Sequence, residues 1–214
     1  MNEKGADRPS RKIRKRNYEP GGVAVKPGTY NLKMHFGDQT SESTIKVEFD
    51  PRLEMSSEAI KEIYNTSKDL EKDQQLMADI VKQLAESKQT ASTFKKDLTK
   101  EDKKKYKDYI KLSKDIITKI DKHIAIFIGK VDKRQGITRN PEVTINRRYF
   151  SARRYVGSRF GHLTSTEERL ISQFKKAFND AVKKTNSFFE TDWKTYKTTL
   201  ETIRISPFKE IQKF

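Results

Sequence analysis

The chain has 214 residues, of which 36% are charged and 33% hydrophobic, and its formal net charge at pH 7 is +16. This length allows one or two domains, and the high charged fraction favours long amphipathic helices over a compact sandwich or barrel. The absence of cysteine excludes disulfides, cysteine-ligated metal sites and a thiol nucleophile. No apolar run approaches the roughly 18 residues of a membrane span.

The first 24 residues are rich in charge, proline and glycine. Within them, the stretch RPSRKIRKR carries six basic residues: Arg8, Arg11, Lys12, Arg14, Lys15 and Arg16. Such a run is typical of an arm that binds nucleic acid or another polyanion. It is also typical of a solvated loop without a ligand, and both interpretations stay open. The start of the chain lacks the apolar core of a signal peptide.

Residues 25–49 alternate between apolar and polar side chains, which predicts a β-hairpin. Its apolar positions are Tyr30, Leu32, Met34 and Phe36 before the turn at Gly37-Asp38, and Ile45, Val47 and Phe49 after it. An isolated two-stranded hairpin is only marginally stable in water. We therefore expect this apolar face to be covered by a helix, or to be partly exposed because its partner strands are absent. Pro51 predicts a domain junction, with one unit at 1–52 and a second at 53–214.

Three- and four-residue spacings of apolar side chains predict a first helix over residues 57–88, capped by Ser56 or Ser57. Residues 89–100 are predicted to form a polar connection, either irregular or partly helical. A second helix is predicted over residues 101–129, antiparallel to the first.

A loop is predicted over residues 130–146, which contain Gly136 and Asn140-Pro141, and a short helix over 144–159. The last helix has two alternative capping boxes, Thr164 with Glu167 or Ser165 with Glu168, and Pro207 is predicted to end it. The fold class is therefore mainly α, with an N-terminal β-hairpin followed by an antiparallel helical bundle of three to four helices.

Candidate catalytic groups are few. The three histidines, His35, His123 and His162, lack metal-ligand spacing and are predicted to be ordinary surface residues. The sequence contains no phosphate-binding loop, no G-x-S-x-G motif and no G-x-G-x-x-G motif. No two carboxylates can be assigned to the flanks of a cleft. We therefore expect no enzyme active site, no cofactor and no metal site.

The most distinctive polar segment is RQGITRNPEVTINRRYFSARRYVGSRFG, residues 134–161, where arginines alternate with aromatic residues. Arginine and aromatic side chains together can bind single-stranded nucleic acid or an anionic glycan. Alternatively, the arginines join this segment to carboxylates and helix C-termini of its neighbours. If an anion-binding site exists, its candidates are Arg139, Arg153 and Arg154.

The stretch GGVAVKPGTYNLKMHFGDQTSESTIKVEFDPR, residues 21–52, resembles the end of a FlgD-type immunoglobulin-like module. The matching residues are Pro27, Gly28, Thr29, Tyr30, Val47, Asp50, Pro51 and Arg52. The preceding MNEKGAD resembles the strand before this end. The segment RQGITRNPEVTINRRYFSARRYVGSRFGHLTSTEE and the closing TDWKTYKTTLETIRISPFKEI are similar to the C-terminal region of the same proteins. These are bacterial BNR-repeat, sortilin-like β-propeller proteins that are labelled glycosyl hydrolases.

The resemblance implies that the hairpin is the remnant of an immunoglobulin-like sandwich whose earlier strands lie upstream. It also implies an exported parent protein, located in the periplasm, in the outer membrane or outside the cell. Any glycosidase activity would belong to the propeller, so no catalytic residue is transferred to this chain. The expected function is a non-catalytic accessory or interaction region whose partner is the rest of that parent. The alternative is a basic helical protein that binds nucleic acid or another polyanion.

Overall fold

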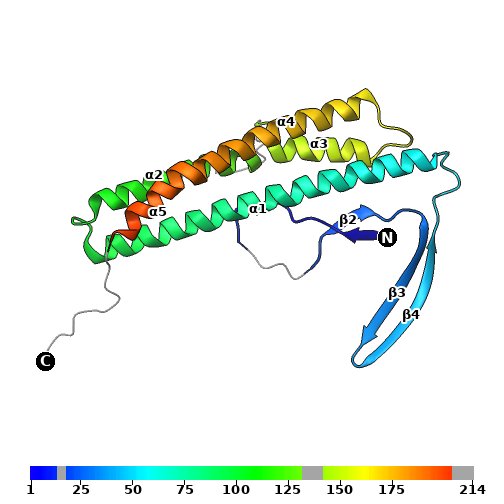
Figure 1. Cartoon of the computed structure of the whole chain (residues 1–214), viewed down its shortest axis with the longest axis horizontal. Coiled ribbons are helices and arrows are strands. Elements are labelled where there is room, and N and C mark those ends of the chain that lie inside the picture. Colours follow the sequence, from blue (N-terminus) through cyan, green and yellow to red (C-terminus); the bar gives the residue numbers. More distant parts are fainter. Residues whose placement is uncertain (14–17, 132–141, 204–214) are drawn as a thin grey trace, which may run out of the picture.

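A computed structural model describes residues 1–13, 18–131 and 142–203. The described residues form α helices, one π-helical turn and two separate antiparallel strand pairs. Figure 1 shows an elongated helical bundle with the strands beside and beyond one of its ends. The prediction of a mainly α fold with an N-terminal hairpin is confirmed.

The helices are arranged as three long rods that lie side by side (Figure 1). The first rod is α1 (Ser57–Asp102). The second consists of α2 (Lys107–Ile128) followed by α3 (Ile145–Gly157), and α1 contacts both. The third runs without interruption through α4 (Ser165–Phe188), the π-helical turn η1 (Phe189–Trp193) and α5 (Lys194–Glu201). Rods one and three run antiparallel to the second, as the short connections predict.

The helix α1 has 46 residues and is about 69 Å long at 1.5 Å per residue. Residues 89–100, for which the sequence left an irregular or a partly helical connection open, are helical throughout and continue α1. The reason is a seven-residue spacing of fully buried side chains that passes through this segment. Its members are Leu70, Met77, Leu84, Ala91 and Leu98. With no glycine or proline in 89–100, nothing ends the helix before Asp102.

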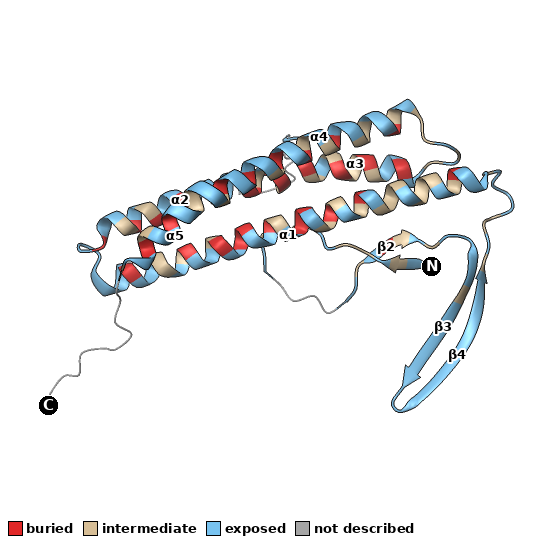
Figure 2. Cartoon of the chain, viewed as in Figure 1, coloured by how far each residue is buried: buried red, intermediate tan, exposed pale blue. Residues whose placement is uncertain are grey.

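Leu98, Tyr106 and Ile110 form a small apolar cluster near the connection between α1 and α2. Apolar side chains from all three rods form the main core, seen as the red inner stripes of Figure 2. Its largest members are aromatic: the rings of Phe174 and Phe178 stack with centroids 5.5 Å apart, and Tyr149 packs against Phe174 at 5.6 Å. Burial raises the pKa of Tyr149 to about 12. The side of α2 that faces the other rods is apolar as well, since Ile110, Ile116, Ile120, Ile124 and Phe127 are buried.

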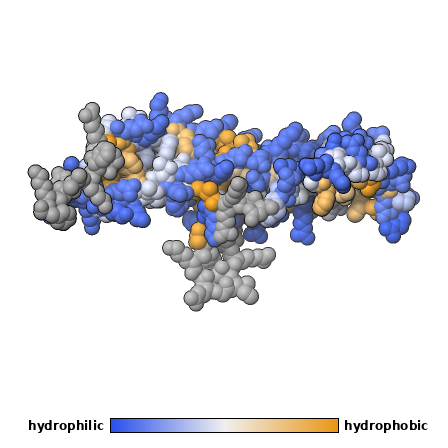
Figure 3. All heavy atoms as spheres, turned by 90° about the horizontal axis from the view of Figure 1, so that it is seen from below, coloured by the Kyte–Doolittle hydropathy of each residue, from blue (hydrophilic) through white to orange (hydrophobic). Residues whose placement is uncertain are grey.

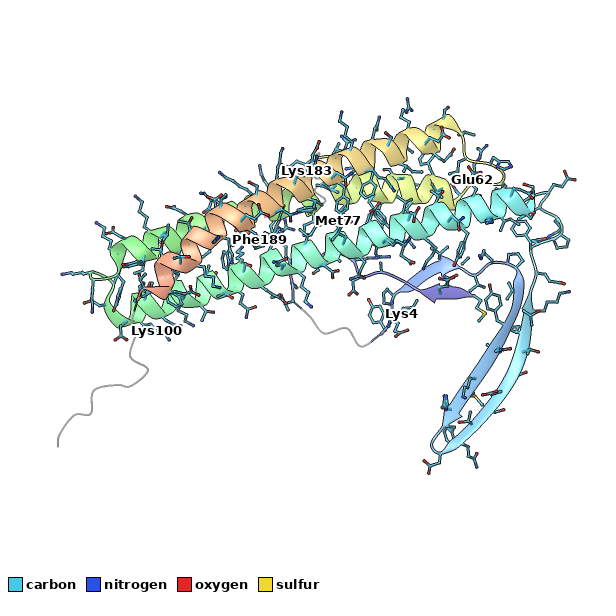
Figure 4. All side chains as sticks on the ribbon, viewed as in Figure 1. Lys4, Glu62, Met77, Lys100, Lys183 and Phe189 are labelled. Carbon is cyan, nitrogen blue, oxygen red and sulfur yellow. The ribbon has the colours of Figure 1, made fainter. Side chains whose placement is uncertain are left out.

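Polar pairs join the rods outside this core. Lys88 of α1 donates to Asp121 of α2 at 2.6 and 2.8 Å, and Lys119 of α2 pairs with Asp192 of η1. Figure 4 shows the contrast along the bundle, with Met77 on the inner side of α1 and Lys183 pointing outward from α4. Exposed ion pairs of this kind contribute little free energy, so they set the alignment of the rods more than their stability.

The π-helical turn corrects the register of the third rod. Buried residues of α4 follow each other at four- and three-residue steps, ending at Thr185 and Phe188. The next four-residue step would place the charged Asp192 in the core. A π turn inserts one residue into the helical repeat, and the core contacts pass instead to Trp193 and Tyr196. The Tyr196 hydroxyl lies 3.0 Å from the buried Ser113 hydroxyl of α2.

The structure decides between the alternative caps. Ser56, not Ser57, caps α1, since its hydroxyl accepts from Ala59 N at 3.1 Å. At α4 the capping box uses Thr164 and Glu167: the Thr164 backbone N–H donates to Glu167 Oε2 at 2.8 Å, and its hydroxyl donates to the same oxygen. These hydrogen bonds lower the pKa of Glu167. The described part of the third rod ends with α5 at Glu201, whereas Pro207 lies outside the described residues.

A short sheet of β1 (Asn2–Lys4) and β2 (Gly21–Ala24) packs against α1. The residue pattern of the first 24 positions did not predict β2, although the resemblance implied a strand at MNEKGAD, where β1 lies. The buried Gln74 holds this segment, because its amide donates to the backbone oxygens of Ala6 and Asp7 at 3.0 Å each. Gly22 is needed at this contact, since a Cβ there would lie 2.7 Å from Glu71 Oε1 and 2.8 Å from Lys4 O.

A first prediction concerns the capping box. Replacing Thr164 by alanine should lower the free energy of unfolding by about 1 kcal/mol, the typical loss for an N-cap hydroxyl. The matched control is Ser165→Ala, which removes the hydroxyl of the unused alternative and should change stability by less than about 0.5 kcal/mol. Urea unfolding followed by circular dichroism measures both. Equal losses in the two variants would contradict the assigned cap.

A second prediction concerns the attachment of the N-terminal sheet. Gln74→Leu should release residues 1–13 from α1, because two backbone carbonyls lose their donors, while the bundle core remains. Hydrogen exchange should become faster in residues 1–13 and 18–24 than in the unmodified chain. The control is Gln83→Leu, an exposed position on the same helix. Unchanged exchange in Gln74→Leu would mean that other contacts hold the sheet.

Candidate functional site

The hairpin of β3 (Gly28–Phe36) and β4 (Gln39–Val47) has one apolar and one polar face. Directly opposed residues of an antiparallel pair project to the same face. The pairs Tyr30 with Ile45, Leu32 with Ser43 and Met34 with Ser41 therefore share one face. The other face carries the pairs Asn31 with Thr44, Lys33 with Glu42 and His35 with Thr40. The alternation predicted from the sequence is confirmed.

The apolar face of the hairpin is open to solvent. Phe36 is 82% exposed, Met34 68%, Leu32 41% and Ile45 39%. No third strand pairs with β3 or β4 in the described part of the chain. Figures 1 and 2 show the hairpin projecting away from the bundle, with almost every residue exposed. Between the two expected outcomes, cover by a helix or exposure, the structure shows exposure.

The base of the hairpin is fixed to the rest of the molecule. The Tyr30 hydroxyl donates to Lys26 O at 2.6 Å, and the Lys26 ammonium lies 4.5 Å from the ring centroid of Tyr64 on α1. Tyr64 in turn donates to the carboxylate of Glu3 on β1. These contacts hold the base of the hairpin close to α1, so that its tip is presented at a distance from the bundle.

The basic N-terminal segment is held against the bundle where the structure describes it. The Arg11 guanidinium donates to Gly129 O, just after the C-terminus of α2, where a cation is favoured by the helix dipole. Burial lowers the pKa of Arg11. Arg8 lies over the ring of Phe150 at 5.7 Å. These two arginines therefore have structural contacts, whereas Arg14, Lys15 and Arg16 lie outside the described residues.

The structure separates the three candidate anion-binding arginines. Arg139 lies outside the described residues. Arg154 is exposed on α3 and lines none of the cavities considered below. Arg153 is partly buried and lines two neighbouring cavities, and it makes no hydrogen bond or ion pair in the described part of the chain. Consecutive residues on one helix thus have different surroundings.

The aromatic residues of the same segment also differ in how far they are buried. Tyr149 is buried in the core and packs edge-on against Phe150 at 5.3 Å. Tyr155 and Phe160 remain 48% and 67% exposed. A continuous stacking surface of arginines and aromatic rings is therefore not formed by these four side chains, because helical periodicity directs half of them inward.

The larger of the two cavities is an open groove of about 420 Å³. It lies between β2 with its connection to β3, the first turns of α1, and the end of α3. Most of its wall is apolar, with Val23, Leu53, Ile60, Ile63 and Phe160 among the lining residues. The smaller cavity, about 200 Å³, has a polar wall that includes Arg8, Glu71, Gln74 and Arg153. The sequence did not predict the groove, since its residues come from separate segments without a common motif.

The histidines have ordinary partners. His35 Nδ1 lies 3.0 Å from the Thr40 hydroxyl. His162 Nδ1 lies 2.8 Å from Glu62 Oε2, and this contact joins the α3–α4 turn to α1. His123 differs from the prediction of a surface residue. It is half-buried, with its ring 4.7 Å from that of Phe188, and burial lowers its pKa.

Among the described residues, no group of three or more histidine, cysteine, aspartate or glutamate side chains could hold a metal ion. In the same residues, no helix is long and apolar enough to cross a bilayer. Figure 3 shows a mainly hydrophilic face on which apolar side chains form separate patches. The two surface features with a specific chemistry are therefore the apolar face of the hairpin and the groove beside Arg153.

Comparison of the chain with the sequence models of known families, with characterised proteins and with solved structures found no match.

Proposed function

We propose that this chain is a non-catalytic interaction module, in which the helical bundle holds the β3–β4 hairpin for docking onto a β-sheet of its partner. The observation that carries the proposal is the hairpin itself. Its apolar side chains are exposed and its outer strand edges have no partner among the described residues. A two-stranded ribbon with an uncovered apolar face gains stability when further strands complete its sheet.

The partner that fits this surface is the remainder of an immunoglobulin-like sandwich. In a sandwich, the inner faces of two sheets pack about 10 Å apart through alternating apolar side chains. Tyr30, Leu32, Met34 and Ile45 have this alternation. Together with the sequence resemblance at Pro27–Tyr30 and Asp50–Arg52, this supports a parent protein of the exported BNR-repeat, sortilin-like β-propeller type. In that parent, any glycosidase activity resides in the propeller.

The proposal is tested first on the coding sequence. An in-frame extension upstream of Met1 that encodes a tryptophan-containing strand and propeller repeats would support it. A stop codon and a ribosome-binding site directly before Met1 would contradict it.

A third prediction tests the hairpin directly. The double variant Met34→Ser with Phe36→Ser should keep the Tm of the bundle within about 2 °C, because both side chains are already exposed. The same variant should weaken association with the upstream sandwich segment, supplied as a separate chain, by at least about tenfold, since two apolar anchors are lost. Calorimetric titration measures the association.

The matched control changes the opposite face of the same strand, with Lys33→Ser and His35→Ser. These residues pair with Glu42 and Thr40 across the hairpin, and exposed pairs contribute little. The control should bind as the unmodified chain does. Equal weakening by both double variants would show that the apolar face does not make the contact.

A second candidate function, polyanion binding, is supported by the net charge of +16. The exposed lysines are spread along the outer sides of α2 and of the third rod. They include Lys107, Lys111, Lys114, Lys119 and Lys122 on α2, and Lys176, Lys183, Lys184, Lys194 and Lys197 on the third rod. Such a distribution attracts anions without fixing one binding position.

A fourth prediction separates the two functions. If the chain is an interaction module, single-stranded DNA should bind weakly at about 50 mM salt and should be released near 150 mM, because binding depends on counterion release. Fluorescence anisotropy across a salt series measures this. Submicromolar binding that persists at 150 mM salt would favour the polyanion-binding function instead.

A further inference from the structure

The groove between β2, the start of α1 and the end of α3 is a surface separate from the hairpin face. Its volume of about 420 Å³ lies within the range of ~300–1,000 Å³ that is typical of small-molecule sites. The apolar side chains of Val23, Ile60 and Ile63 come from the sheet and from α1. Leu53 and Phe160, on the connecting segments, add two more and remain 37% and 67% exposed.

The groove exists because the end of α3 does not fill it. Gly157 forms part of its lining, and a Cβ placed there would meet no atom within 4 Å. The first turns of α1 extend to this end of the bundle, where Ile60 and Ile63 are only partly covered. The result is an apolar groove beside the C-terminal end of α3, and this groove is open to solvent.

The charge of the groove is positive. Lys26, Arg153 and Arg159 line it, and the lining contains no aspartate or glutamate. Two of these cations already have contacts: Lys26 lies over the Tyr64 ring, and Arg159 Nε donates to His162 O at 2.9 Å. Arg153 has no hydrogen bond or ion pair in the described part of the chain. Arg153 also borders the smaller cavity with Arg8 and Glu71. Since no described residue binds its guanidinium, this group can bind a planar anion through two parallel hydrogen bonds.

The apolar walls and the Arg153 guanidinium indicate which chemical groups a ligand of this groove should have. An unbranched alkyl chain needs no hydrogen-bond partners, whereas the backbone of a peptide would lose its hydration against these side chains. A carboxylate at the end of the chain matches the guanidinium geometry. We propose that this groove binds a medium-chain fatty carboxylate, with the alkyl chain along Val23, Ile60 and Ile63 and the carboxylate on Arg153. This site does not depend on the proposed docking function of the hairpin.

The test uses the whole chain and dodecanoate, titrated by calorimetry below the concentration at which the ligand forms micelles. We expect saturable binding of one dodecanoate per chain. Arg153→Gln should weaken it about tenfold, the effect of losing a charge-assisted hydrogen bond pair. The matched control is Arg154→Gln, which removes the same charge from the neighbouring exposed residue and should leave the affinity unchanged.

Two further measurements locate the ligand. Gly157→Leu adds a side chain where a Cβ meets open space, so it should block binding while the bundle stays folded. Dodecyltrimethylammonium has the same alkyl chain with the opposite charge, and it should bind at least about tenfold more weakly than dodecanoate.

Each of four results would overturn the proposal. The first is the absence of saturable dodecanoate binding. The second is an equal loss of affinity in Arg153→Gln and Arg154→Gln, which would indicate general attraction to a basic surface. The third is unchanged binding by Gly157→Leu, which would place the ligand elsewhere. The fourth is equal affinity for dodecyltrimethylammonium, which would exclude recognition of the carboxylate.

Discussion

The uninterrupted length of α1 is the constraint on which the other elements depend. Its buried side chains recur every seven residues from Leu70 to Leu98, so one face of the helix stays directed at the core. The second rod needs two helices, α2 and α3, to cover this length, and the third rod needs a π turn to keep its aromatic residues in contact with the other two. The N-terminal sheet and the base of the hairpin are attached to α1 through Gln74 and through Tyr64, which donates to Glu3 of β1.

The attachment to α1 explains why the two proposed binding surfaces occur where they do. The groove forms where the sheet, α1 and the end of α3 meet without filling the space between them. The hairpin begins at the same place and extends outward, so its base is anchored and its tip is free of the bundle (Figure 1). The proposed docking of a sandwich and the proposed binding of a fatty carboxylate therefore use adjacent surfaces. The docking surface is the apolar face of the hairpin, and the carboxylate site is an apolar groove lined by the Arg153 side chain.

Several of the basic side chains have structural contacts. Arg11 binds at the C-terminus of α2, Arg8 lies on Phe150, and Lys88 and Lys119 connect rods through carboxylates. Lysines on the outer sides of the helices, such as Lys107 and Lys183, are exposed to solvent. Against this background Arg153 differs, because it lines both the apolar groove and the smaller polar cavity and has no ion-pair partner in the described ranges.

The sequence by itself determined the local features. Alternation at Tyr30–Phe36 specified the two faces of the hairpin, and three- and four-residue spacings specified the core sides of α1, α2 and α4, because side-chain direction follows backbone periodicity. Residue spacing alone limited the N-terminal cap of α4 to two choices, Thr164 with Glu167 or Ser165 with Glu168. The continuation of α1 through residues 89–100 is also a local feature, since Ala91 and Leu98 extend the seven-residue spacing and the segment has no glycine or proline. Only the tertiary structure decided what lies against each face, where the register of the third rod shifts, and whether a helix covers the hairpin. It also decided that Arg153 faces a groove while Arg154 does not. These outcomes depend on contacts between segments far apart in the chain, and no local pattern encodes such contacts.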